Sequence, residues 1–269
     1  SIYMNKQKKT TLKKPTIFQF TLGLIVSIFK SFGKKHNTKE PQAVGKYNLI
    51  SSVNKTNLFR NYSIGIYKNK NKKTFIKTWT GLVRDFEYYE LVNEYLVSKM
   101  LYKKLKLNKY IKIPKVIGYI AQNKSLSIIY EYVDGKPLSD FSLEKQKKIL
   151  IEILKSFNNA KDFIVSKNDR YFSKRTLFYY IPALAFLTVV AMISNIRSFR
   201  VILRAYFDFL RHIGSIREHK IRIAHRDLNP HNILIKGKYI YLIDCSRTNL
   251  TYEGYDIAYI TINPKLRKI

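Results

Sequence analysis

Two spacings of hydrophobic residues occur along the first half of the chain. Apolar side chains recur at helical intervals over Asp85–Leu105, which predicts one amphipathic helix there. Elsewhere short apolar runs are bounded by turn-prone segments such as Asn69–Lys73, a pattern typical of strands and hairpins. The predicted strands are Tyr62–Tyr67, Thr74–Thr78, Ile113–Ile120 and Leu126–Tyr132. We therefore expect a small antiparallel sheet that carries one helix.

A turn signal at Asp134 and Gly135 separates this sheet from the second half of the chain. The next periodic stretch, Ser142–Phe157, predicts a helix with Ser142 as its cap. We expect an α+β fold with two lobes joined by a hinge. Residues 46–133 would form the first lobe and residues 134–269 the second, preceded by a basic and apolar extension over residues 1–45.

The chain is strongly basic, because 50 Lys and Arg residues stand against 18 Asp and Glu residues and give a formal net charge of +32. A field of this strength gathers anionic partners, which favours nucleic acid, an anionic membrane surface or a phosphorylated substrate. Compositional drift toward Lys, Asn, Ile and Tyr is an alternative source of the charge. Cys245 is the single cysteine, which excludes an intramolecular disulfide and a CxxC metal site.

The sharpest chemical pattern lies in His225–Asn232 and the residues that follow it. Asn232 comes five positions after Asp227, two strand-like stretches follow, and Asp244 ends the second of them. Carboxylate and amide oxygens are the hard ligands that Mg²⁺ prefers. The pattern predicts a compact site that holds Mg²⁺ against phosphate through Asn232 and Asp244. Asp227 would then accept a hydrogen bond from an acceptor hydroxyl.

These residues, HRDLNPHNILI followed by YLIDCSR, resemble the catalytic and metal-binding loops of the protein-kinase-like superfamily. The motif is most similar to that of bacterial lipopolysaccharide core kinases, including the Kdo and heptose kinases. Aminoglycoside and choline phosphotransferases have related motifs. The resemblance implies a two-lobed protein-kinase-like fold, with a small antiparallel-sheet N-lobe and a mostly helical C-lobe. It also implies an ATP-dependent kinase that binds ATP in the cleft between the lobes, with Mg²⁺ on Asn232 and Asp244 and with Asp227 as the catalytic residue.

Upstream residues occur in the order that this superfamily requires. The stretch Phe75-Ile76-Lys77 resembles the strand that ends in the phosphate-binding lysine. Glu94, on the helix that follows, resembles the carboxylate that forms an ion pair with that lysine and orients it toward the α- and β-phosphates. Glu90 is the rival for this role, and Glu87 is a weaker candidate.

Residues 128–138 resemble the superfamily's hinge, which implies that backbone groups around Glu131 and Tyr132 hydrogen-bond adenine. Asp256 resembles the structural aspartate that braces the catalytic loop in small-molecule kinases. The alternative for Asp256 is an ordinary charge at a helix N-terminus. We interpret His225 as a structural hydrogen-bonding residue and not as a base.

The chain departs from the superfamily pattern in three places. No GxGxxG precedes Lys77, and the chain offers only Asn61–Gly65 in its place. Cys245 and Ser246 stand where kinases usually have Phe and Gly, and we expect Cys245 to be packed and unreactive. Only 25 residues follow Asp244, too few for a protein kinase's activation segment and its later helices. A protein acceptor is therefore disfavoured.

Two apolar segments bear on localisation. Thr16–Phe32 follows the basic residues 1–14, is too short and interrupted for a membrane span, and lacks a signal-peptide cleavage site, which predicts an interfacial helix. The uncharged segment Thr176–Ile196 has the length of a span. Spanning ranks below re-entrant or peripheral contact there, because a span would separate Lys77 from Asp227.

Together these features predict a phosphotransferase that moves the γ-phosphate of ATP to a hydroxyl. The expected acceptor is a sugar of lipopolysaccharide core or of another anionic glycolipid, reached by a cytoplasmic enzyme that lies peripherally at the inner face of the membrane. A soluble small-molecule or protein kinase is the alternative within enzymes, and a catalytically inactive nucleotide-binding pseudokinase is the alternative of another class. Nucleic acid is a disfavoured partner, because the chain contains no recognisable nucleic-acid-binding module.

Overall fold

The computed structural model describes residues 12–31, 40–53, 62–122, 124–159, 181, 185, 188–189, 196–218 and 220–262. The chain divides into two compact units. The first unit contains Ser1–Tyr102 and Pro114–Val133, and the second contains Lys103–Ile113 and Asp134–Ile269. Each unit is described by itself.

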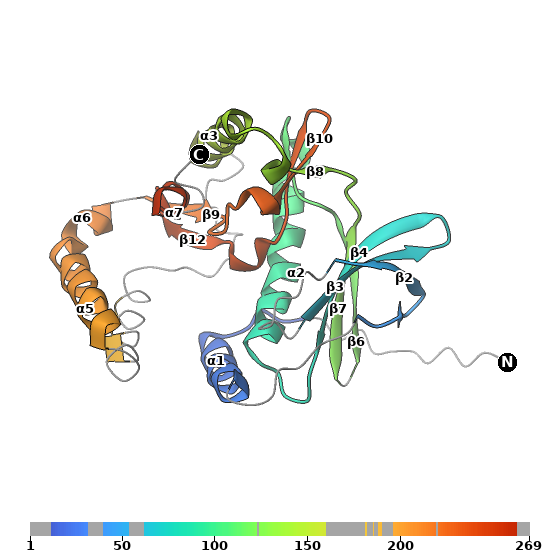
Figure 1. Ribbon diagram of the computed structural model, residues 1–269, viewed down its shortest axis with the longest axis horizontal. Helices are drawn as coiled ribbons and strands as arrows, with labels where there is room; N and C mark the ends of the chain where they lie inside the picture. The colour runs from blue at the N-terminus through green and yellow to red at the C-terminus, as the bar shows by residue number, and fades with distance from the viewer. Residues whose placement is uncertain are drawn as a thin grey trace. The chain divides into compact units, whose positions relative to one another are not determined.

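An antiparallel sheet forms the first unit (Figure 1). Its strand order is β1-β2-β3-β4-β7-β6, and β3 and β4 form a hairpin that pairs Tyr62 with Trp79 at one end and Asn69 with Lys72 at the other. The strands are β1 (Ala43–Val44), β2 (Tyr47–Ser52), β3 (Tyr62–Asn69), β4 (Lys72–Thr80), β6 (Val116–Gln122) and β7 (Ser125–Glu131). All four strands expected over residues 62–132 are present, and β4 lies between β3 and β7 from Thr74 to Trp79.

Helix α2 (Phe86–Lys104) covers one face of this sheet. Successive residues of a strand point to opposite faces, so Ile76 packs in one cluster of the core while Trp79 packs in the other, against α2. Asp85 caps the helix, since its Oδ1 accepts hydrogen bonds from the amide of Tyr88 at 3.1 Å and from Nε1 of Trp79 at 2.7 Å. The cap therefore fixes the start of α2 to strand β4.

Helix α1 (Ile17–Ser31) occupies nearly the whole of the segment for which an interfacial helix was expected. It packs against the first turn of α2, where the ring centroids of Phe20 and Phe86 lie 6.0 Å apart. A hydrogen bond from Ser27 Oγ to Glu87 Oε2, 3.2 Å long, joins the two helices at the same place. The apolar N-terminal segment is thus attached to the first unit.

The second unit contains two small sheets and several helices. Its larger sheet has the order β5-β11-β10-β8, in which β5 runs parallel to β11 and the other neighbours are antiparallel. Its strands are β5 (Ile111–Lys112), β8 (Lys136–Pro137), β10 (Ile233–Lys236) and β11 (Tyr239–Leu242), and the smaller sheet pairs β9 (Ile221–Ala224) with β12 (Asn249–Tyr252). The parallel pairing of Ile111 with Ile240 places residues 103–113 in this unit.

The helices of the second unit include α3, whose start matches the expected cap at Ser142, and α7, which follows β12 directly. They are α3 (Leu143–Asn159), α5 (Ile196–Arg211), α6 (Ile213–Glu218) and α7 (Tyr255–Ile262), with short 3-10 helices η1 (Leu105–Leu107), η2 (Leu138–Asp140), η4 (Pro230–Asn232) and η5 (Cys245–Arg247). No helix within the described residues is long and apolar enough to cross a membrane. Most of the apolar segment 176–196 lies outside the described residues.

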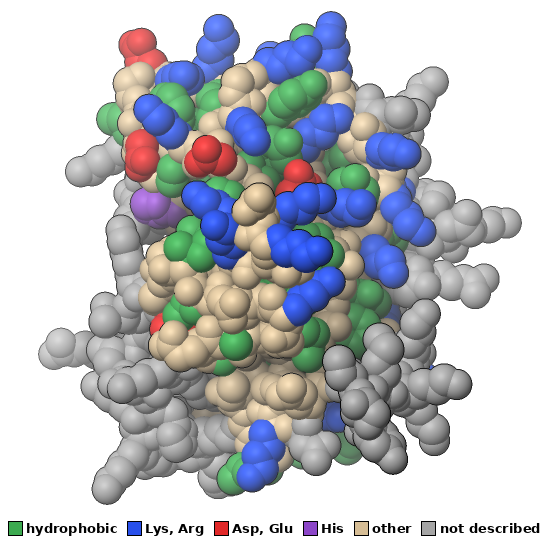
Figure 2. Space-filling model, turned by 90° about the vertical axis from the view of Figure 1, so that its right-hand side faces the viewer, with side chains coloured by type: hydrophobic (Ala, Val, Ile, Leu, Met, Phe, Trp, Pro, Cys, Tyr) green, Lys and Arg blue, Asp and Glu red, His purple; other side chains and the backbone are tan. Residues whose placement is uncertain are grey.

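Basic side chains outnumber acidic ones on the face drawn in Figure 2. Figure 2 shows one face on which Lys and Arg side chains crowd the upper part and Asp and Glu are sparse. This distribution agrees with the formal net charge of +32. Such a surface attracts anions and repels polycations from solution.

Candidate active site

Lys77 and Glu94 form a buried ion pair in the first unit. Lys77 Nζ lies 2.8 Å from Glu94 Oε1 and 2.9 Å from Oε2, and each residue is only 4% exposed. The alternation of β4 turns Lys77 toward α2, and Glu94 meets it from that helix. Removing two charges from water offsets most of the attraction between them, so a buried ion pair adds little net stability. What the pair does provide is a cation held in one place.

The residues expected to contact adenine lie at the end of β7. The amide of Glu131 donates a hydrogen bond to the carbonyl oxygen of Lys115 at 2.8 Å, and Glu131 Oε2 accepts one from the Lys115 amide at 3.3 Å. Tyr132 is half-buried, with Lys73 Nζ 5.6 Å from its ring centroid. The Glu131 amide is therefore engaged by Lys115, the residue that precedes β6.

The position that a glycine-rich loop would occupy falls between β2 and β3. Residues 54–61 of this connection lie outside the described residues. Of the stretch Asn61–Gly65, residues 62–65 belong to β3 and pair with β4. A backbone turn over phosphate is therefore not formed by those residues.

In the second unit, the loop that contains Asp227 leaves β9 through a left-handed residue. Arg226 has φ 65°, a conformation that side-chain-bearing residues rarely adopt. The carboxylate of Asp256, 6% exposed, holds this turn: Oδ2 accepts a hydrogen bond from the His225 amide at 2.9 Å, and Oδ1 accepts one from the Arg226 amide at 2.7 Å. Of the two interpretations of Asp256, the geometry matches the brace of the loop.

The electrostatics of Asp256 follow from its position. Burial raises the pKa of Asp256 above its ordinary value, and the nearby charge of His225 together with the two amide hydrogen bonds opposes that rise. Both carboxylate oxygens are occupied by N–H donors. The site therefore demands two acceptors on one side chain.

Asp256→Asn is expected to destabilise the fold by about 1–3 kcal/mol, because the amide NH₂ must face a backbone N–H and leaves that donor unsatisfied. Urea unfolding of the two proteins measures the difference. Asp140→Asn is the control, since Asp140 is exposed and in the same unit. Equal unfolding midpoints for the native protein and Asp256→Asn would contradict the bracing role.

Asp227 is half-buried, and α7 orients its carboxylate. The hydroxyl of Tyr259 donates a hydrogen bond to Asp227 Oδ1 at 2.8 Å. The carbonyl oxygen of Asp227 accepts hydrogen bonds from the Asn229 amide at 2.7 Å and from Asn232 Nδ2 at 3.1 Å. The backbone and one carboxylate oxygen of Asp227 are thus fixed by three separate contacts.

Asn232 and Asp244 are joined through the backbone. The amide of Ile243 donates a hydrogen bond to the Asn232 carbonyl oxygen at 2.9 Å, which brings the end of β11 beside η4. Asp244 then adopts a left-handed conformation, φ 58° and ψ 55°, and its Oδ1 accepts a hydrogen bond from Ser246 Oγ at 3.2 Å. Asn232 in η4 and Asp244 after β11 therefore lie in the same short region of the second unit.

The donor set fits Mg²⁺. Because Asn232 donates through Nδ2, its Oδ1 remains the atom suited to a cation, and Asp244 adds a carboxylate. Mg²⁺ commonly uses one or two protein oxygens and completes its shell with water and phosphate oxygens. No cluster of three His, Cys, Asp or Glu side chains suited to a metal occurs among the residues that the structure describes. Two oxygen ligands would leave most of a cation's coordination shell to water or phosphate oxygens.

The loop packs on a small buried core. His225 and Cys245 are 0% and 1% exposed, with Cys245 Sγ 4.0 Å from His225 Nε2. Their burial agrees with the structural roles expected for both. Arg226 stacks its guanidinium carbon 4.8 Å from the Tyr255 ring centroid and donates a hydrogen bond to the Tyr255 hydroxyl at 3.2 Å. These contacts hold the loop between β9 and α7.

Sequence reasoning missed Tyr259. The available signal was its spacing from Asp256, because residues three apart on a helix share one face. With Asp256 bonded to residues 225 and 226, a residue on the same face of α7 reaches Asp227. Tyr259 is therefore a positioning residue for Asp227.

Tyr259→Phe is expected to lower kcat for phosphate transfer about tenfold and leave KM for ATP nearly unchanged, because it removes one hydrogen bond to a charged group. Steady-state kinetics at varied ATP concentration separates the two constants. Tyr110→Phe, in the same unit and partly exposed, serves as the control. A change confined to KM would contradict the positioning role.

No family model and no curated protein sequence matches the chain. Solved structures of aminoglycoside phosphotransferases do match. APH(4)-Ia superposes with a TM-score of 0.60 at 13% identity, covering 88% of this chain and 76% of that one. A thermostable mutant of it, in a ternary complex with ADP and hygromycin B, gives 0.59 at 12%, covering 80% and 72%.

The aminoglycoside-3'-phosphotransferase of type VIII gives a TM-score of 0.55 at 15% identity, covering 82% of this chain and 80% of that one. Likeness at this identity establishes the fold. The expected α+β class is confirmed, and these neighbours belong to the protein-kinase-like superfamily. The chain has the two-lobed protein-kinase-like fold.

Proposed function

We propose that this protein is an ATP-dependent phosphotransferase that moves the γ-phosphate of ATP to a sugar hydroxyl of an anionic glycolipid, such as lipopolysaccharide core. The observation that carries the proposal is the catalytic loop. Asp227 is oriented by Tyr259, and the amide oxygen of Asn232 and the carboxylate of Asp244 offer hard ligands to a divalent cation. The fold supports this assignment because its structural neighbours include complexes with ADP.

Each residue then has a distinct role. Lys77, oriented by Glu94, neutralises the α- and β-phosphates, and backbone groups around Glu131 and Tyr132 hold the adenine. Asn232 and Asp244 bind Mg²⁺, which neutralises charge on the transferred phosphate when it is bound. Asp227 accepts a hydrogen bond from the acceptor hydroxyl and takes its proton as the new bond forms.

The reaction balances as a single displacement. The acceptor oxygen forms a bond to the γ-phosphorus while the bond from that phosphorus to the β–γ bridging oxygen breaks, and ADP leaves with that oxygen. The hydroxyl proton moves to Asp227 and then to solvent. The products are ADP and a phosphomonoester on the sugar.

Two features support a small anionic acceptor over a protein. The chain passes from Asp244 through η5 directly into β12 and α7, so these described residues form no long peptide-binding segment after the metal ligand. A formal net charge of +32 attracts anionic sugars and repels polycationic aminoglycosides. We therefore place the acceptor among phosphate- or carboxylate-bearing glycolipids at the inner face of a membrane.

A panel of acceptors tests this assignment. Labelled Mg-ATP is incubated with the enzyme and lipopolysaccharide, hygromycin B or a generic protein, in separate reactions. Label in the lipopolysaccharide alone is the expected result. Label confined to hygromycin B or to the protein would overturn the acceptor class while leaving the phosphotransfer chemistry in place.

A further inference from the structure

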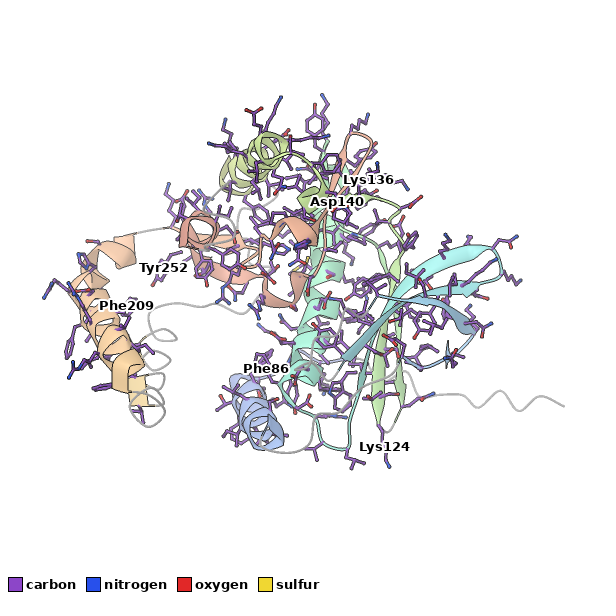
Figure 3. All side chains as sticks on the ribbon, in the orientation of Figure 1. Phe86, Lys124, Lys136, Asp140, Phe209 and Tyr252 are labelled. Carbon is purple, nitrogen blue, oxygen red and sulfur yellow. The ribbon has the colours of Figure 1, made fainter. Side chains whose placement is uncertain are left out.

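Helix α1 contacts the start of α2 through Phe20, Gly23 and Ser27. A Cβ atom at Gly23 would lie 2.8 Å from Tyr89 Cδ2 and 3.0 Å from backbone atoms of Asp85 and Phe86. Ser27 Oγ accepts a hydrogen bond from the Phe86 amide at 3.2 Å. Figure 3 labels Phe86 beside α1, at the start of α2. The face of α1 that meets the protein is thus a close-packed, partly polar one.

The opposite face of α1 is apolar and exposed. Phe18, Leu22 and Ile25 recur four and three residues apart, so they share one side of the helix. A rotation of about 100° per residue places this side opposite Gly23 and Ser27. The exposed fractions of Phe18, Leu22 and Ile25 are 75%, 46% and 45%. A helix of a globular domain normally turns its apolar stripe to the core, whereas α1 packs Phe20 inward and leaves these three apolar side chains exposed.

The loop that leads into α2 exposes further apolar side chains close in sequence to the residues that α1 packs against. Leu82 and Val83 are 79% and 54% exposed, and they precede Asp85, whose backbone α1 touches. We define the α1 patch as Phe18, Leu22, Ile25, Leu82 and Val83. Large apolar side chains that are exposed together on neighbouring segments mark sites that contact another molecule or a membrane.

Exposed basic residues flank the segments of the α1 patch, and the acidic residues at the start of α2 are engaged within the protein. Lys13 precedes α1, Arg84 follows Leu82 and Val83, and all three of Lys13, Arg84 and Lys124 are exposed. The amide of Gly81 donates a hydrogen bond to the Lys124 carbonyl oxygen at 2.9 Å, which joins the loop after β4 to the turn between β6 and β7. Asp85 is buried and bonded to Trp79, and Glu87 is bonded to Ser27.

We infer that the α1 patch is a docking surface for an anionic lipid bilayer. Apolar side chains would enter the boundary between headgroups and acyl chains, and the flanking Lys and Arg would contact anionic headgroups. A bilayer accounts for both the apolar stripe and the basic rim. The inference deepens the proposed function, since it explains how the enzyme reaches a glycolipid, and for that purpose it rests on the proposed acceptor.

Vesicle sedimentation of the full chain tests this surface. The protein is mixed with phosphatidylcholine vesicles with or without phosphatidylglycerol. We expect binding to the anionic vesicles, and we expect Leu22→Ser with Ile25→Ser to weaken it at least about tenfold, because two apolar side chains no longer enter the bilayer. The inference would be overturned if the native protein did not bind anionic vesicles, or if the double variant bound them as tightly as the native protein.

A matched control separates the patch from general hydrophobicity. Ile50→Ser with Ile117→Ser replaces two residues of the same unit with nearly equal exposure, 48% and 49%, and should bind as the native protein does.

Sedimentation equilibrium without lipid tests whether a second copy of the chain occupies the patch. A native dimer that dissociates in the Leu22→Ser, Ile25→Ser variant, with no vesicle binding, would assign the patch to a second copy and overturn the inference.

Nucleotide binding and transfer to a lipid-free acceptor distinguish this inference from the proposed function. The double variant Leu22→Ser, Ile25→Ser should bind ATP normally. It should also phosphorylate a sugar fragment that carries no lipid at the native rate. If native protein binds anionic vesicles but transfers no phosphate to glycolipid, the proposed function fails and the docking surface stands. If transfer to glycolipid in vesicles is equal in both proteins, the docking surface is not the route to the substrate.

Discussion

Replacing Asp227 with Asn is expected to lower kcat for phosphate transfer by about 10²–10⁴-fold, because a positioned acid–base group contributes that much to the rate. The amide oxygen of Asn can still accept the hydrogen bond that Tyr259 donates at 2.8 Å, so the loop should keep its geometry. The substitution then removes the negative charge and the proton acceptor alone. Steady-state kinetics and nucleotide binding measure the two effects separately, and affinity for ATP should change little.

Asp208→Asn is the matched control for that experiment. Asp208 lies on α5 with its side chain 51% exposed and 3.6 Å from Arg211, a surface pair of small energetic value. Its kinetics should equal those of the native protein. Native kcat for Asp227→Asn would show that this carboxylate does not act on the acceptor hydroxyl.

Lys77→Met is expected to abolish measurable phosphate transfer and to destabilise the protein by about 3–5 kcal/mol, because it leaves the Glu94 carboxylate buried without its counter-charge. The two side chains are 5% exposed and their charged atoms are 2.8 Å apart. Urea unfolding measures the stability, and ATP titration measures the lost phosphate contact.

A double replacement separates the two consequences. Lys77→Met with Glu94→Leu removes both charges, so stability should return close to the native value while transfer stays absent. Lys72→Met, on the exposed end of the same strand, is the control and should behave as the native protein does. Phosphate transfer by the double variant at the native rate would show that the ion pair serves the fold and not the nucleotide.

Local pattern was enough for much of the first unit. The alternating runs and the turn after Asn69 correctly predicted the hairpin of β3 and β4, and the helical spacing over 85–105 predicted α2 to within one or two residues. These elements are long and pair with neighbours in sequence, so their signal is local. The fold class followed from the motifs and is confirmed by the structural neighbours.

The sequence pattern did not predict short strands whose partners are distant along the chain. The two-residue strand β5 exists because Ile111 pairs in parallel with Ile240, and β9 exists because it pairs with β12. Neither strand has enough residues to show a period of two. The pairing of Ile111 with Ile240 spans more than a hundred residues, so it depends on the assembled fold and not on local preference.

The candidate site divides in the same way. Residue types in a fixed spacing pointed to Asp227, Asn232 and Asp244, because their chemistry depends on those types, and the resemblance to the superfamily pointed to Lys77. The geometry adds Tyr259, which bonds to Asp227 across 32 residues, and it shows that the Glu131 amide is engaged by Lys115. A tyrosine in a helix is common enough to lack a signal until its partner is known.

The face of α1 that packs on the protein was also beyond the sequence. An apolar run such as Thr16–Phe32 predicts a helix, yet the stripe that meets α2 contains Gly23 and Ser27 and leaves Phe18 outside. Hydrophobicity alone does not tell which of the apolar residues of α1, Phe18 or Phe20, faces the protein. The choice is made by close contact at Gly23, which only the folded partner supplies.

The most direct test of the central claim follows the γ-phosphorus of ATP by phosphorus NMR, in a reaction that contains Mg²⁺, native protein and a mixture of sugar and glycolipid acceptors. The account predicts a new phosphomonoester signal that grows as ATP is converted to ADP, and that is absent with Asp227→Asn. Native protein that binds ATP but forms no phosphomonoester with any acceptor would contradict the account and identify a nucleotide-binding protein without transferase activity.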